Sequence, residues 1–85
     1  MVDNAIKQLE EWVGNNYTDL ADWATDARTL TEDFKKGYIS EDEYLELMSD
    51  LKRSKKISDA ADDLAVRSRA VELIDNLIKS AGVIL

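Results

Sequence analysis

Apolar side chains recur along the first part of the chain at the spacing of an α-helix. Successive apolar positions are separated by four, three and four residues, which places them on one face of a helix. Trp12 widens this face. The positions are Val2, Ile6, Leu9 and Val13. The pattern predicts a helix over about residues 3–13.

The stretch after this helix allows two interpretations. Gly14, Asn15 and Asn16 have poor helix propensity, and Thr18 resembles an N-cap that is followed by acids in a first helical turn. A turn there gives a second helix over about residues 18–36. However, the apolar register nearly continues across the stretch, so one kinked helix from about residue 3 to 36 is the alternative.

The segment around Gly37 predicts a sharp turn between two helices. Lysines precede the glycine, as they do at helix C-termini, and glycine suits the left-handed position that closes a Schellman turn with Tyr38. Ser40 and Glu43 then form a capping box, which starts a helix over about residues 41–54. Because only about four residues join the helices, residues 18–54 are expected to form an αα-hairpin.

The last predicted helix is the longest, over about residues 58–81. Aliphatic side chains recur there every seven residues, a spacing that keeps them close to one helix face. These residues are Ile57, Leu64, Val71, Ile78 and Leu85. Together the patterns predict an all-α fold: residues 1–85 form a single domain, a small three- or four-helix bundle that contains the capped hairpin and a long C-terminal helix.

Composition narrows the possible functions. The chain has no cysteine and no histidine, so it lacks thiolate chemistry, the commonest metal ligand and the usual general base near neutral pH. We therefore expect no enzyme activity, no catalytic residue and no cofactor. No apolar run is long enough to span a membrane, and the N-terminus does not resemble a signal peptide. These features predict a cytoplasmic protein, or one assembled into a virion.

A calcium loop is suggested by residues 37–43, which match the second half of an EF-hand. The first half does not match, because Phe34 and Lys36 stand where oxygen ligands are needed. The capping box explains the same residues, so we expect no metal site.

The net charge of −7 is concentrated in the N-terminal part, where acids outnumber bases most strongly. This balance argues against direct nucleic-acid binding and favours a basic protein partner. A set of acids falls on one face of the second predicted helix, and it is either an ordinary solvated face or a mimic of nucleic-acid phosphates. The set is Asp19, Asp22, Asp26 and Asp33.

Gly82 is expected to end the last helix and leave three aliphatic residues, Val83, Ile84 and Leu85. These residues either fold back onto the bundle or are buried in a partner, and the sequence leaves both open. With the seven-residue stripe they form the predicted partner interface, which comprises Ile57, Leu64, Val71, Ile78, Val83, Ile84 and Leu85.

Residues 30–51 resemble the short two-helix module known as SHOCT. The resemblance rests on Leu30, Phe34, Gly37, Ile39, Ser40, Glu43, Tyr44 and Leu51, and it departs at Leu47, where the module usually carries a lysine. It implies an interaction or oligomerisation hairpin with no catalytic residue. In size and acidity the chain is also similar to small helical proteins of tailed bacteriophages, which implies a role in virion assembly or in inhibition of a host enzyme.

These observations predict a non-enzymatic helical interaction module, a structural or assembly component that self-associates or docks a protein partner. The alternative is an acidic inhibitor that mimics nucleic acid and blocks a host nucleic-acid-binding protein.

Overall fold

A computed structural model of the chain describes residues 2–17, 20–55, 57 and 64–83. The described part contains four helices and no strand, so the predicted all-α fold is confirmed. The helices are α1 (Val2–Asn16), α2 (Ala21–Lys36), α3 (Glu41–Lys52) and α5 (Leu64–Ser80).

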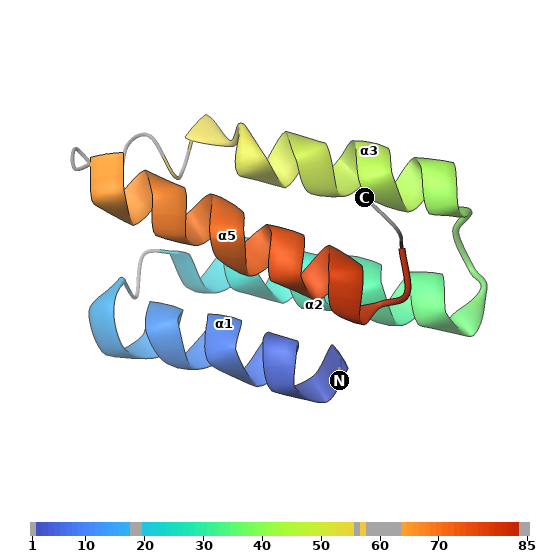
Figure 1. Cartoon of the computed structure of the whole chain (residues 1–85), viewed down its shortest axis with the longest axis horizontal. Helices are drawn as coiled ribbons and strands as arrows, with labels where there is room; N and C mark the ends of the chain where they lie inside the picture. Colours follow the sequence, from blue (N-terminus) through green and yellow to red (C-terminus); the bar gives the residue numbers. More distant parts are fainter. Residues whose placement is uncertain (1, 18–19, 56, 58–63, 84–85) are drawn as a thin grey trace.

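The four helices form an antiparallel bundle in which consecutive helices run in opposite directions (Figure 1). α1 packs against α2 and α5, and α3 packs against the same two helices. The bundle measures 35 × 21 × 20 Å. This arrangement places α2 between α1 and α3, so that one groove can form on each side of it.

Each helix contributes buried apolar side chains to one core. Leu9 of α1, Met48 of α3 and Leu77 of α5 are completely buried, and Trp23 of α2 is 1% exposed. At about 25 cal/mol per Å² of apolar surface removed from water, such residues supply the main driving force for folding.

The turn between α2 and α3 has the predicted geometry. Gly37 has φ = 83°, and the amides of Gly37 and Tyr38 donate to the carbonyl oxygens of Phe34 and Asp33 at 3.1 and 2.9 Å, which is a Schellman motif. The capping box follows, with Glu43 N–H donating to Ser40 Oγ and Ser40 N–H donating to Glu43 Oε1. Local chemistry therefore sets this turn, as the sequence predicts.

The first connection lies further along the chain than expected. α1 continues through Gly14 to Asn16, and Tyr17 N–H still donates to the carbonyl of Val13. The helix persists because Val13 is buried, and its packing outweighs a glycine penalty of about 1 kcal/mol. The chain thus forms two helices in place of one kinked helix.

α2 begins at Ala21 rather than at residue 18, and Leu20 occupies its N-cap position without a side-chain hydrogen bond. The predicted cap, Thr18, lies outside the described residues.

The other ends are also shifted. α3 ends at Lys52, two residues before the predicted end at residue 54. α5 is described from Leu64 to Ser80, and residues 58–63 of the predicted last helix lie outside the described part. Gly82, with φ = 100°, follows the end of α5, in agreement with its predicted role as a helix terminator.

Candidate protein-interaction surface

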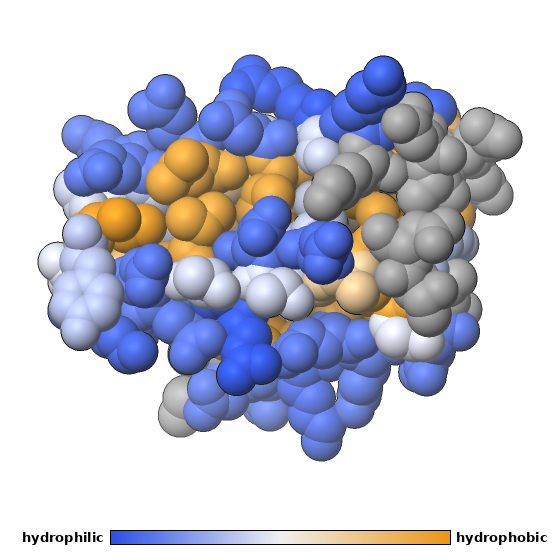
Figure 2. All heavy atoms as spheres, turned by 180° about the vertical axis from the view of Figure 1, so that it is seen from behind, coloured by the Kyte–Doolittle hydropathy of each residue, from blue (hydrophilic) through white to orange (hydrophobic). Residues whose placement is uncertain are grey.

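A shallow apolar groove lies between α2 and α3, and we call it the hairpin groove. Its apolar lining consists of Leu30, Leu47 and Leu51, and its volume is about 320 Å³. Leu47 is 38% exposed, while Leu30 and Leu51 are partly buried. Figure 2 shows apolar side chains gathered on this face of the molecule and bordered by polar ones. The groove is therefore an open apolar surface on a mainly polar molecule.

Helix geometry explains why these leucines reach the surface. Each residue turns about 100° around the helix axis, so neighbours in sequence point to different sides. Met48 is completely buried in the core, and Leu47 consequently faces outward. Thr31 of α2 is also completely buried. The adjacent Leu30 is turned about 100° away from it and is only partly buried.

Hydrogen bonds join α2 to α3, the two helices that form the hairpin groove. Trp23 Nε1 donates to the carbonyl oxygen of Leu51 at 3.0 Å, which joins α2 to the end of α3. Thr31 Oγ1 lies 2.8 Å from the buried hydroxyl of Tyr44, whose ring stacks on Phe34 with centroids 4.6 Å apart. Burial raises the pKa of Tyr44, and the hydrogen bond with Thr31 partly opposes this effect. These contacts keep the two helices in one register, so the groove is preformed.

Carboxylates border the hairpin groove on both helices. Asp26 of α2 and Asp50 of α3 belong to its lining, which contains no lysine or arginine. Asp26 is exposed and has no ion-pair partner in the described part of the chain, whereas Asp50 pairs with the exposed Arg53 at 3.2 Å. Electrostatically, the rim favours a cationic ligand.

Of the predicted acidic face on α2, Asp26 lines this groove. Asp22 and Asp26 are exposed and Asp33 is partly exposed. They span an arc of only about 40° on the helix, given about 100° per residue. Asp19 lies outside the described residues. The sequence predicted these acids but not the apolar groove. The signal that could have indicated the groove was Leu47, which lies one helical turn before Leu51 and next to the core residue Met48.

The predicted partner interface does not form one exposed stripe. Ile57, Ile78 and Val83 are 3%, 2% and 4% exposed and belong to the core. Val71 is partly buried, and only Leu64, at 73%, is well exposed among the described members. These three residues therefore pack within this chain, and the partner interface itself stays a prediction.

Leu64 and Ile78 differ in their position along α5. Leu64 is the first described residue of the helix and is exposed, whereas Ile78 lies near the other end and faces the core. The drift of a seven-residue repeat around a straight α-helix is only about 20° per repeat, so it keeps both residues close to one face.

At the C-terminus, Val83 folds back onto the bundle. Its N–H lies 3.4 Å from the carbonyl oxygen of Ile78, and its side chain is buried within the same chain. Of the two readings of the aliphatic end, the structure supports folding back for Val83. Ile84 and Leu85 lie outside the described residues.

The described residues contain no cluster of three or more potential metal-ligating side chains. None of the described helices combines the length and apolarity required to cross a membrane.

Comparisons with known proteins gave no relative. No family model matches the chain, and neither a curated protein nor a solved structure is significantly similar to it. The likeness of residues 30–51 to the SHOCT module stays a prediction from the residue pattern.

Proposed function

We propose that this chain is a non-enzymatic helical interaction module whose hairpin groove binds an amphipathic, basic helix of a protein partner. The observation that carries the proposal is the combination of an open apolar groove with carboxylates on both borders and no cation in its lining. An assembly role, in the cytoplasm or in a virion, agrees with the small, acidic, cysteine-free sequence.

The groove has the spacing that a helical ligand needs. Leu47 and Leu51 are one turn apart on α3, about 6 Å at 1.5 Å per residue. An amphipathic helix presents apolar side chains at i, i+3, i+4 and i+7, which match such a row. Lysines or arginines beside these anchors would face Asp26 and Asp50. Apolar contacts would then supply affinity, and the charges would select a basic partner.

Binding to a designed peptide tests the chemistry. One helical peptide carries leucines at the anchor positions with flanking lysines, and a second carries the same leucines with flanking glutamates. Isothermal titration is expected to show binding of the lysine peptide and much weaker binding of the glutamate peptide. Equal binding of both peptides, or of neither, would contradict the proposal.

A matched pair of variants locates the surface. Leu47→Gln removes an apolar side chain from the hairpin groove, and Leu64→Gln makes the same change on α5, where the leucine is also exposed. We expect Leu47→Gln to weaken lysine-peptide binding about tenfold, which corresponds to loss of about 1.4 kcal/mol. Leu64→Gln is expected to leave it unchanged. The opposite result would move the interface to α5 and favour self-association, which light scattering on the purified chain measures directly.

A second candidate is a mimic of nucleic-acid phosphates that blocks a host protein. It is supported by Asp22 and Asp26, which are exposed, and by Asp33, which is partly exposed. The two functions differ in which change abolishes partner capture. Replacing these three aspartates by asparagine is expected to abolish binding by a mimic, while Leu47→Gln leaves the mimic intact. For a groove-binding module, Leu47→Gln has the larger effect.

A further inference from the structure

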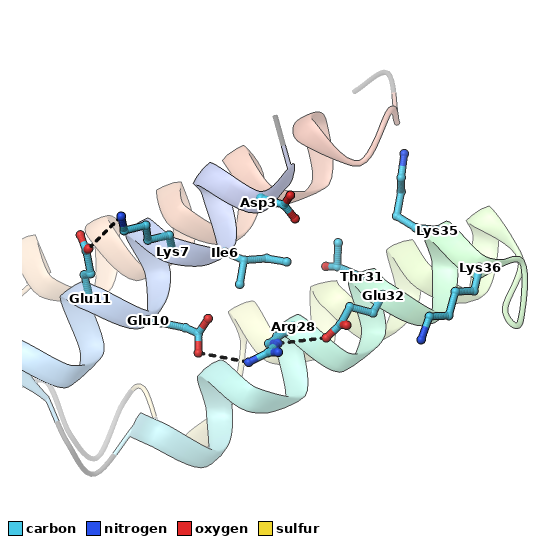
Figure 3. Close-up of a pocket in the computed structure, with 10 residues that line it drawn as sticks. All are labelled: Asp3, Ile6, Lys7, Glu10, Glu11, Arg28, Thr31, Glu32, Lys35 and Lys36. Atoms are coloured by element: carbon cyan, nitrogen blue, oxygen red, sulfur yellow. Dashed lines mark hydrogen bonds and ion pairs between the residues drawn. The ribbon is translucent and has the colours of Figure 1, made fainter.

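A second and larger groove lies on the other side of α2, between α2 and α1 (Figure 3). Its volume of about 570 Å³ falls in the range of small-molecule sites. Ile6, which is partly buried, and Thr31 lie at its base. The hydroxyl of Thr31 is already hydrogen-bonded to Ala27 and Tyr44, so the floor leaves no polar group unsatisfied.

One end of this groove is closed by ion pairs within the protein. Arg28 lies 3.5 Å from Glu10 of α1 and 3.0 Å from Glu32 of its own helix. The pair with Glu10 joins the two helices across the groove, as Figure 3 shows, and the pair with Glu32 lies within α2. Glu10 and Glu32 share the one guanidinium of Arg28, so this cluster keeps a net charge of −1.

The other end carries cations without such partners. Lys35 and Lys36 line the groove in the last turn of α2, are exposed, and form no ion pair in the described part of the chain. Their side chains leave α2 in different directions and border the groove at two points (Figure 3). Asp3 of α1 is the single lining carboxylate outside an ion pair in the described part of the chain. The lining as a whole has four acids and four bases, so its positive charge is confined to the end that holds the two lysines.

We propose that this α1–α2 groove binds a small amphipathic anion, an alkyl carboxylate. The carboxylate would pair with Lys35 or Lys36, and the alkyl chain would lie over Ile6. The two lysines favour an anion at their end of the groove, in contrast to the cationic ligand favoured by the acidic hairpin groove. The two sites lie on opposite sides of α2, so this inference is independent of the proposed interaction function.

A series of probes on the unaltered protein tests the site. Acetate, butyrate, hexanoate and octanoate are titrated into isotopically labelled protein, and amide shifts are followed by NMR. Complete burial of a methylene is worth about fourfold in affinity, and an open groove buries only part of it. We expect about a twofold gain per methylene, with shifts at Ile6 and Lys35. Octylammonium, which has the same alkyl chain and the opposite charge, is expected to bind much more weakly.

Variants then test the two lysines. Lys35→Gln combined with Lys36→Gln is expected to weaken octanoate binding at least fivefold. Lys79→Gln removes an exposed cation from α5, outside this groove, and is the matched control that should bind normally.

Three outcomes would overturn the proposal: equal binding of octylammonium, an equal loss in Lys79→Gln, or octanoate shifts centred on Leu47. The probe series on the unaltered protein decides the matter even if the double variant is unstable.

Discussion

The buried pair Thr31 and Tyr44 provides the most demanding test of how this bundle is held together. Both side chains are completely buried, and their oxygens are 2.8 Å apart. Thr31 Oγ1 also lies 2.9 Å from the carbonyl oxygen of Ala27, which can only accept. Thr31 must therefore donate its one hydroxyl proton to Ala27, and the Tyr44 hydroxyl must donate to Thr31.

This direction predicts unequal effects of the two single substitutions. Tyr44→Phe removes the donor and leaves Thr31 still bonded to Ala27, so it should cost about 0.5–1.5 kcal/mol, the net value of one hydrogen bond. Thr31→Val removes the acceptor and leaves a buried tyrosine hydroxyl unsatisfied, which should cost about 1–3 kcal/mol. Valine keeps the branched shape of threonine, so the packing is nearly unchanged.

The double variant makes the prediction sharper. With both polar groups removed, no buried hydroxyl is left unsatisfied, and Thr31→Val/Tyr44→Phe should be more stable than Thr31→Val alone. Urea unfolding followed by tryptophan fluorescence gives the four free energies of a double-mutant cycle. The reasoning is refuted if Tyr44→Phe costs more than Thr31→Val, or if the two single effects simply add.

Four further predictions follow from the same structure. Because burial raises the pKa of Tyr44, the folded state holds the hydroxyl proton of Tyr44 more tightly than the unfolded state does. The resulting contribution to folding stability is complete below the ordinary pKa of 10.0 and is lost as the pH rises through the folded pKa. Urea unfolding of Tyr44→Phe at alkaline pH should therefore lack this loss of stability. Gly37→Ala should destabilise the fold by about 1–2 kcal/mol, because φ is 83° at this position. Gly14→Ala should instead stabilise it by about 0.5–1 kcal/mol, because Gly14 lies inside α1 with open space around it. Urea midpoints of the two variants that move in the same direction would contradict this pair of predictions. Ser40→Ala should cost about 1 kcal/mol through loss of the cap, and thermal melts that show no change would exclude a contribution of the capping box. Leu47→Gln should change the free energy of unfolding by less than about 1 kcal/mol, because the side chain is 38% exposed. A larger decrease of this free energy in urea unfolding would assign Leu47 to the core instead of to a binding surface.

The sequence by itself determined the features that depend on neighbouring residues. The apolar spacing identifies the helices, and the Schellman turn at Gly37 and the capping box at Ser40 and Glu43 appear as predicted. Each of these rests on interactions within a few residues of chain, such as the Tyr38 amide with the Asp33 carbonyl. Local chemistry of this kind is the same in any surrounding fold, so it can be predicted without one.

Tertiary packing decided the rest. Burial of Val13 carries α1 past Gly14 to Asn16, against local propensity. Leu64 and Ile78 belong to the same seven-residue repeat, but Leu64 at the start of α5 is exposed and Ile78 near its end lies in the core. Both grooves exist only because α2 packs between α1 and α3, which brings residues distant in sequence to opposite sides of an opening. Which apolar side chains become core and which become surface depends on where neighbouring helices lie, and periodicity along one helix does not contain that information.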